Sequence, residues 1–321
     1  KMNIIITGGA GFIGSHLCEF LLNKGDNIIC VDNLGSGDRK NIKEFEEKEN
    51  FVFIEFDITK TLEEFEKILE NKGFVGENKI NQIYHLASRA SPNDYQEFPV
   101  ETALSNSLGL NNMIKLSMKH NAVILFSSTS EAYGQPKVHP QPETYWGNVN
   151  PVGIRSCYDE SKRFGEALLM AYHRKFNAKV KIIRIFNTYG PKMRKDDGRV
   201  IPNFIQQALN NNEITIYGNG EQTRSFCYVT DLVEGIVKMM NSAEIGPKNL
   251  GNPREMTILE CAQKVIDAAD SNSKLIFNSL PEDDPTKRQP DISSARQFLD
   301  WEPKIEFEEG IKKTIEWFKE N

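Results

Sequence analysis

Residues 7–16 read "TGGAGFIGSH", and they follow directly on the apolar run "MNIIIT" at residues 2–7. The glycines Gly8, Gly11 and Gly14 recur at every third position and stand just before a helical pattern. Such a turn lets the backbone approach a pyrophosphate, which the free N–H groups of the first helical turn then bind. The stretch therefore predicts a dinucleotide-binding turn between the first strand and the first helix.

The next strand candidate, "NIICVD" at residues 27–32, ends on Asp32. An acidic residue at this distance from the glycines accepts hydrogen bonds from the hydroxyls of an adenosine ribose. Its charge would repel a 2′-phosphate, so we expect NAD rather than NADP as the cofactor. An ordinary glycine turn with an unrelated strand-end aspartate is the alternative, which this combined context disfavours.

Strand and helix patterns alternate through the first part of the chain. The strand candidates are rich in β-branched residues and nearly continuously apolar, as strands covered on both faces are. Strands are expected over residues 2–7, 27–32, 51–58, 82–88, 122–128 and 179–187, and helices over 12–23, 101–119 and 159–176. This alternation predicts an α/β fold with a Rossmann-type, doubly wound parallel sheet.

The character of the sequence changes after Asn187, where a loop rich in glycine, proline and charge is followed by shorter elements. We expect a dinucleotide-binding domain over residues 1–188. Residues 189–321 are expected to form mainly a smaller substrate-binding lobe, with some segments returning to the first domain. The Pro/Gly-rich segment 134–157 is long for a compact domain, and loops of this length are usually functional.

The bulk composition excludes several classes of protein. A net charge of −6 over 321 residues argues against nucleic-acid and anionic-membrane partners. No apolar run has the length of a membrane span, and no signal-peptide pattern is present. Five cysteines without a C-x-x-C motif suggest buried thiols in a reducing cytoplasm, and the scattered histidines predict no metal site.

Tyr158 and Lys162 lie four residues apart in "CYDESKR", on one face of an expected helix. A free tyrosine has a pKa of about 10, and a neighbouring ammonium favours its phenolate. Lysine can also bind the nicotinamide ribose. We therefore expect a proton acceptor beside a hydride acceptor, which suits the oxidation of an alcohol.

Glu131 follows the apolar strand candidate 122–128 in "STSEAYG" (residues 128–134). A buried carboxylate is costly unless it has a partner or a use. Glu131 is thus either solvated in a loop or directed at a reacting substrate.

The glycine pattern with Tyr-x-x-x-Lys resembles the extended short-chain dehydrogenases/reductases, which act on nucleotide sugars. Thr129-Ser130-Glu131 resembles UDP-glucuronate decarboxylases, as does "DDPTKRQPDI" at residues 283–292. Sugar 4-epimerases usually lack this acid, and 4,6-dehydratases carry Thr-Asp-Glu. Two departures are Arg89, where proline is expected, and Ser161, where glycine is common.

This resemblance implies that UDP-glucuronate is oxidised at C4, with Tyr158 taking the hydroxyl proton and NAD the hydride. The resulting β-keto acid loses CO2, C5 is protonated, and the hydride returns to C4 to give UDP-xylose. Thr129 would hold the C4 oxygen with help from Ser130, and Glu131 would position the ring or protonate C5. Arg288 corresponds to an arginine near the departing carboxylate.

The expected binding residues divide into two groups. The cofactor group comprises Gly8, Gly11, Phe12, Ile13, Gly14, Asp32, Asn33, Asp57, Ile58, Leu86, Ser105, Tyr158 and Lys162. The substrate group comprises Asn187, Arg199, Tyr217, Arg224 and Arg288. Tyr217 would stack on uracil and Asn187 would bind a phosphate or a sugar hydroxyl. UDP needs local positive charge, for which the loop also offers Lys192, Arg194 and Lys195, although many of these side chains would merely be solvated.

Relatives of this family dimerise through helices that correspond to residues 101–119 and 159–176, so we expect a homodimer. The apolar candidates on these helices are Leu108, Met113, Leu168, Leu169 and Met170, whose alternative role is burial against the parent sheet. Competing functions are a decarboxylase that releases the 4-keto-pentose, a 4-epimerase or a 4,6-dehydratase. A catalytically silent NAD-binding sensor or scaffold is disfavoured by Tyr158, Lys162 and Glu131.

Overall fold

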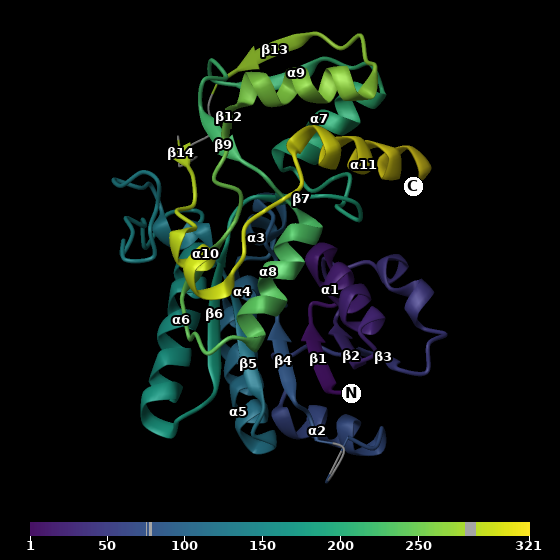
Figure 1. The fold of residues 1–321 in the computed structure, drawn as a ribbon, viewed down its shortest axis with the longest axis vertical. Coiled ribbons are helices and arrows are strands. Elements are labelled where there is room, and N and C mark those ends of the chain that lie inside the picture. The colour runs from purple at the N-terminus through teal and green to yellow at the C-terminus, as the bar shows by residue number, and fades with distance from the viewer. Residues whose placement is uncertain (75, 77–78, 280–286) are drawn as a thin grey trace.

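A parallel seven-stranded sheet forms the centre of the computed structural model, which describes residues 1–74, 76, 79–279 and 287–321. Its strand order is β11-β6-β5-β4-β1-β2-β3, and every neighbouring pair is parallel (Figure 1). The order runs outward from β1 in both directions, which is the doubly wound arrangement. The predicted Rossmann-type fold is confirmed.

The strands of this sheet agree with the predicted runs, with differences at their ends. They are β1 (Asn3–Thr7), β2 (Asn27–Asp32), β3 (Phe51–Glu55), β4 (Gln82–His85), β5 (Val123–Thr129), β6 (Val180–Ile185) and β11 (Lys248–Leu250). The predictions for 51–58, 82–88 and 179–187 extended too far. The apolar pattern continues beyond the hydrogen-bonded ladder, so Asp57, Leu86 and Asn187 lie in loops after their strands. β11 comes from beyond residue 188 and pairs with β6.

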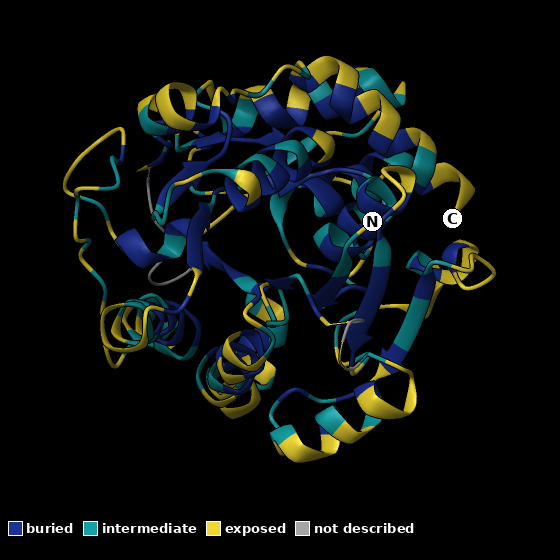
Figure 2. Cartoon of the chain, turned by 60° about the horizontal axis from the view of Figure 1, so that its bottom comes forward, coloured by how far each residue is buried: buried dark blue, intermediate teal, exposed yellow. Residues whose placement is uncertain are grey.

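Helices cover both faces of the sheet. α1 (Phe12–Asn23) and α8 (Val229–Asn241) contribute Leu17 and Leu232 to the core cluster on one face. On the other face, α5 (Leu110–His120) and α6 (Ser156–Phe176) contribute Leu110 and Leu169. The remaining helices of this part are α2 (Leu62–Asn71), α3 (Pro92–Glu97), α4 (Pro99–Leu104) and α10 (Ser293–Leu299). Figure 2 shows buried strands inside and exposed outer helix faces.

The helix predicted over 101–119 is divided. α4 passes into a π-helical segment, η4 (Ser105–Gly109), before α5 begins. Asn106, buried in this segment, donates to Ser161 Oγ of α6 at 3.0 Å and to Ser88 Oγ at 3.0 Å. Ser161, where glycine was expected, thus links η4 to α6. Short 3-10 helices are η1 (Arg39–Asn41), η2 (Lys43–Phe45) and η5 (Ser130–Tyr133).

The later part of the chain builds a second core beyond the carboxyl ends of the sheet strands (Figure 1). Its helices are α7 (Val200–Leu209), α9 (Ile258–Ala269) and α11 (Phe307–Glu320). Its strands are β7 (Thr188–Tyr189), β8 (Ile214–Tyr217), β9 (Thr223–Ser225), β10 (Cys227–Tyr228), β12 (Glu255–Thr257), β13 (Leu275–Asn278) and β14 (Lys287–Arg288). Of the motif at 283–292, residues 283–286 lie outside the described residues.

Segment 134–157 forms turns and isolated bridges ahead of α6. Gln141, fully buried, exchanges hydrogen bonds of 2.9 Å with the main chain of Gln289. This long loop therefore anchors the residue next to Arg288, which belongs to a late strand outside the central sheet.

No helix within the described residues is both long and apolar enough to cross a membrane. The five cysteines are free thiols; Cys157 is half-buried and the others are buried. In the same described residues, no group of three or more His, Cys, Asp or Glu side chains is arranged to hold a metal ion.

Candidate active site

A cleft of about 900 Å³ lies between the carboxyl edge of the sheet and the later part of the chain. Its walls include the glycine turn, the loops after β2 and β4, the end of β5, the start of α6 and strands of the second core. Every member of the predicted catalytic, cofactor and substrate groups lines this cleft, as do Lys192 and Arg194, whereas Lys195 does not. The fold thus brings together residues that are up to 280 positions apart, from Gly8 to Arg288.

The glycine turn leaves space and donors for an anion. Gly8 has φ +73°, and a Cβ there would lie 2.8 Å from Ala87 N. A Cβ on Gly14 would lie 2.1 Å from Gly8 O, so only glycine lets α1 approach the turn. Gly11 precedes α1 without a side-chain cap, which leaves first-turn N–H groups available for a ligand. This cradle fits a pyrophosphate.

Asp32 lies at the end of β2 with its carboxylate held by main-chain groups. Oδ2 accepts from Ala10 N at 3.0 Å and Oδ1 from Leu34 N at 2.8 Å. Burial raises the pKa of Asp32, while these main-chain hydrogen bonds oppose the rise. A Cβ on Gly37 would lie 2.9 Å from Asp32 Oδ2, so glycine keeps the space beside the carboxylate open. A carboxylate with open space beside it can accept hydrogen bonds from the free hydroxyls of a ribose.

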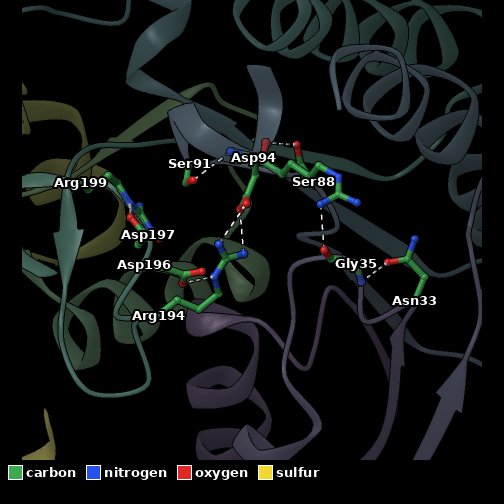
Figure 3. Close-up of polar contacts among 10 residues, drawn as sticks. Asn33, Gly35, Ser88, Ser91, Asp94, Arg194, Asp196, Asp197 and Arg199 are labelled. Carbon is green, nitrogen blue, oxygen red and sulfur yellow. Dashed lines mark hydrogen bonds and ion pairs between the residues drawn. The ribbon is translucent and has the colours of Figure 1, made fainter. Parts of the chain in front are cut away.

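Arg89 joins the two loops at the cofactor end of the cleft. Its Nη1 donates to Gly35 O at 2.8 Å, and its guanidinium carbon lies 4.1 Å from the centre of the Phe98 ring. The Gly35 main chain also donates to Asn33 Oδ1 at 3.0 Å (Figure 3). The side chain that departs from the family pattern thus ties the loop after β4 to the loop after β2.

Tyr158 and Lys162 share the buried face of α6. Lys162 Nζ donates to Ser127 O at 2.7 Å and lies 5.8 Å from the centre of the Tyr158 ring. Burial raises the pKa of Tyr158 to about 12, although a hydrogen bond with Thr129 and the charge of Arg199 each act to lower it. Burial likewise lowers the pKa of Lys162 to about 7. The net pKa shift of Tyr158 is thus upward, opposite to the direction that a neighbouring ammonium favours, because burial of the phenol has the largest effect.

Glu131 is neither solvated nor unpartnered. Its Oε2 accepts from Arg155 Nη2 at 2.7 Å and from Arg288 Nη2 at 3.2 Å. Burial alone would raise the pKa of Glu131, but the charges of Arg288, Arg155 and Arg224 outweigh burial and lower it. Arg288 is only 2% exposed and also donates to Ser130 O at 3.0 Å. The solvated-loop interpretation is wrong for both Glu131 and Arg288.

Local carboxylates neutralise much of the predicted basic loop. Arg194 Nη1 and Nη2 each lie 3.0 Å from a carboxylate oxygen of Asp94, as Figure 3 shows. Arg199 Nη2 donates to Asp197 at 2.8 Å. Lys192 Nζ lies 3.2 Å from Glu44 Oε1, and Lys195 is exposed. The Arg194–Asp94 pair therefore ties this loop to α3, and both residues line the cleft.

The remaining substrate candidates occupy the second wall. Tyr217 ends β8 and is 45% exposed, so its ring is available for stacking. Arg224 of β9 is buried and donates to Thr223 O at 2.9 Å. Asn187 O accepts from Cys227 N at 2.9 Å, which holds the loop after β6 against β10.

Sequence reasoning missed Arg155, Asp159 and Tyr95, which complete the surroundings of Tyr158. The Tyr95 and Tyr158 rings stack with centroids 5.1 Å apart and an interplanar angle of 5°. Burial, with repulsion from Glu131, raises the pKa of Asp159 to about 7. The length of loop 134–157, which contains Arg155, was the available signal, but nothing in the sequence paired Arg155 with Glu131.

The doubly wound sheet, its glycine turn and the Tyr158–Lys162 pair at its carboxyl edge define a short-chain dehydrogenase/reductase. The family model described as GDP-mannose 4,6 dehydratase matches residues 5–314. The chain belongs to this family.

Among curated relatives, the chain is 48% identical over 319 residues to UDP-glucuronic acid decarboxylase 4 of Arabidopsis thaliana, which covers 99% of the chain and 69% of that protein. Among solved structures, UDP-glucose 4-epimerase of Thermotoga maritima with UDP-glucose is 31% identical with a TM-score of 0.89, covering 99% of both chains. UDP-glucuronic acid 4-epimerase of Bacillus cereus is 26% identical with a TM-score of 0.85, again covering 99% of both chains. That structure is a tyrosine-to-phenylalanine mutant in complex with UDP-4-deoxy-4-fluoro-glucuronic acid and NAD.

Proposed function

We propose that this protein is a UDP-glucuronate decarboxylase that uses NAD catalytically and makes UDP-xylose. The observation that carries the proposal is Glu131, held by Arg155 and Arg288 beside Tyr158 at the end of β5. Support also comes from the 48% identity to a UDP-glucuronic acid decarboxylase over nearly the whole chain. Arginine inside the cleft gives a carboxylated sugar a counter-charge that a neutral hexose does not need.

The cleft residues fit NAD in three places. The glycine cradle Gly8–Gly14 would hold the pyrophosphate, Asp32 the adenosine ribose hydroxyls, and Lys162 the nicotinamide ribose. Asn33, Asp57, Ile58, Leu86 and Ser105 would line the remainder. When bound, NAD supplies a hydride acceptor that takes the C4 hydrogen of the sugar with its two electrons and later returns it.

Tyr158 would accept the proton from the C4 hydroxyl of the sugar. The hydrogen bond with Thr129 and the charge of Arg199 both favour the phenolate and so oppose the effect of burial. Thr129 would hold the same C4 oxygen, with the Ser130 main chain fixed by Arg288. These residues thus orient an alcohol for oxidation and later return the proton.

A ketone at C4 stands β to the C6 carboxylate, so the C5–C6 bond can break with its electron pair passing to the ketone as an enolate. CO2 leaves, a proton adds to C5, and the sugar is reduced again at C4. Arg288 would bind the departing carboxylate and thereby hold the bond in place for cleavage. Because the pKa of Glu131 is lowered, Glu131 would act as a carboxylate that orients the ring or the proton donor.

The second core would bind the nucleotide. Tyr217 offers an exposed ring for uracil, while Arg224, Arg199 and Asn187 line the same wall of the cleft. Asp197 already accepts from Arg199, so an incoming phosphate would compete with a carboxylate for Arg199.

We further propose a cytoplasmic homodimer formed through α4, α5 and α6. Met113 and Leu169 are buried in the core of the chain and so are not available to an interface, whereas Leu168 and Met170 pack against that core and stay partly exposed. Leu108 is 43% exposed, and exposed apolar side chains on the same helices include Val100, Leu104 and Phe164. Light scattering should report a dimer that Leu108→Glu with Phe164→Glu converts to a monomer; a wild-type monomer would contradict this.

Incubation with UDP-glucuronate and NAD, followed by mass analysis of the products, tests the function directly. We expect loss of CO2 and formation of a UDP-pentose that co-elutes with UDP-xylose. Accumulation of the 4-keto-pentose with NADH would favour the keto-releasing enzyme. Loss of water or simple isomerisation would favour a 4,6-dehydratase or a 4-epimerase and overturn the proposal.

A further inference from the structure

Two arginines hold the same oxygen of Glu131. Arg155 Nη2 lies 2.7 Å and Arg288 Nη2 lies 3.2 Å from Glu131 Oε2. Arg155 directly precedes α6, whereas Arg288 belongs to β14, which the chain reaches much later. The carboxylate is thus held from two independent parts of the fold.

The two arginines differ in how they are fixed. The Arg155 main-chain carbonyl accepts from the N–H groups of Tyr158 and Asp159 at 3.0 Å, so Arg155 begins the helix that carries the reacting tyrosine. Its Nε lies 4.0 Å from Asp159 Oδ2, and its guanidinium carbon lies 6.0 Å from the centre of the Tyr95 ring. Arg155 is therefore built into the wall that also supports Tyr158.

One N–H group of Arg288 is left without an acceptor among the described residues. Its Nη1 and Nη2 bond Ser130 O and Glu131. Its buried Nε has no hydrogen-bond partner among the described residues. A buried guanidinium N–H without an acceptor is costly and marks a place where an acceptor can bind. Arg288 can thus engage a second carboxylate, which the substrate of the proposed function would bring.

Glu131 then depends on Arg155. If Arg288 divides its charge between Glu131 and a substrate carboxylate, the shorter bond to Arg155 becomes the main compensation for Glu131. A buried carboxylate that loses its partner becomes protonated or shifts position. If Glu131 moved when the substrate bound, it could no longer orient the sugar ring or the proton donor.

We propose that Arg155 is a positioning residue that keeps Glu131 ionised and oriented while Arg288 serves the carboxylate of the substrate. This inference rests on the proposed function and assigns Arg155 a role that is distinct from that of Arg288. Among the residues that the structure describes, the charged or titratable groups around Glu131 include Arg155, Tyr158 and Asp159 at the start of α6, Tyr95 of α3, Arg224 of β9 and Arg288 of β14. Within this set, the arginines favour the carboxylate form of Glu131 against burial.

The test compares Arg155→Gln and Arg155→Lys with wild type by following kcat and KM for UDP-glucuronate across pH. For Arg155→Gln we expect kcat to fall about 100-fold, with KM changed by less than about threefold, as for loss of a group that orients the reaction. The acid limb of the kcat profile should move up by about one pH unit, since a nearby arginine lowers a carboxyl pKa by about that much or more. Arg155→Lys keeps the positive charge, so its acid limb should lie close to that of wild type.

Arg174→Gln is the matched control, because it removes one positive charge from the exposed far end of the same helix. Its kcat profile should equal that of wild type. NAD affinity and thermal unfolding report whether each variant is folded. If Arg155→Gln does not fold, Arg155→Met replaces it, because methionine keeps the aliphatic packing of the arginine side chain.

An acid limb that stays in place in folded, NAD-binding Arg155→Gln would overturn the inference, as would a change confined to KM. Wild type that decarboxylates UDP-glucuronate, together with unshifted variants, would overturn this inference alone. Wild type that leaves UDP-glucuronate intact would overturn the proposed function, and the role of Arg155 with it.

Discussion

Gly14→Ala should weaken NAD binding by closing the space between α1 and the glycine turn. The added Cβ would lie 2.1 Å from Gly8 O and 2.8 Å from Gly9 Cα, and both are backbone atoms that cannot rotate away. Alanine gains about 1 kcal/mol over glycine in a helix interior. Overpacking costs about 1–3 kcal/mol, and this approach belongs at the upper end. The free energy of unfolding should therefore fall by about 2 kcal/mol.

Relief of the clash must move α1 away from the turn that is expected to hold the pyrophosphate. We expect the Kd for NAD to rise by about tenfold or more, the equivalent of about 1.4 kcal/mol. Calorimetric titration with NAD measures the affinity, and thermal unfolding measures the stability.

Gly310→Ala in α11 is the control, since its Cβ would lie 2.2 Å from the buried Tyr189 hydroxyl, in the second core. This variant should lose stability and keep its affinity for NAD. Wild-type affinity in Gly14→Ala, or an equal loss of affinity in Gly310→Ala, would refute the assignment of the turn.

Three further results are expected. Tyr158→Phe should abolish turnover while NAD remains bound, which mass analysis of the products and titration with NAD measure. Full activity of this variant would show that Tyr158 is not the proton acceptor. Glu131→Gln should lower kcat by about 100-fold with a modest change in KM, and an unchanged kcat would return Glu131 to a structural role. The folded-state pKa of Asp159, about 7, exceeds the ordinary aspartate value of 3.8, so the folded protein binds one proton more than the unfolded chain between these values. The stability of wild type should therefore fall as the pH rises from about 4 to 7. Asp159→Asn should remove this part of the pH dependence. A wild-type melting temperature that is constant over this range would contradict the assignment.

The central sheet could be predicted because its strands are continuous apolar runs and its first turn needs glycine. The strand ends were less predictable, since Phe56 and Ile58 stay buried after β3 has ended and therefore extend the apolar pattern. The division of the helix near Ser105–Gly109 was not foreseen. This π-helical segment is tied to α6 by a hydrogen bond from Asn106 to Ser161, a tertiary contact that helical periodicity does not encode.

The site could be predicted where motif spacing is local. Tyr158 and Lys162 are one helical turn apart, and the glycines adjoin a strand and a helix. The charge network was not predictable from spacing, because Arg155 and Arg288 meet at Glu131 from positions 133 residues apart along the chain. The upward shift of the Tyr158 pKa was not predictable either, because it comes from burial. That burial depends on tertiary packing by elements such as α3, whose Tyr95 stacks on Tyr158.

The central claim is a transient ketone at C4 of the sugar, and UDP-glucuronate that carries deuterium at C4 tests it most directly. Conversion in ordinary water, followed by NMR of the product, should give UDP-xylose that retains deuterium at C4, and conversion of unlabelled substrate in D2O should place one deuterium at C5. Decarboxylation in which the C4 deuterium never appears on the reduced nicotinamide during a single turnover, or in which it is lost to the solvent, would contradict the account.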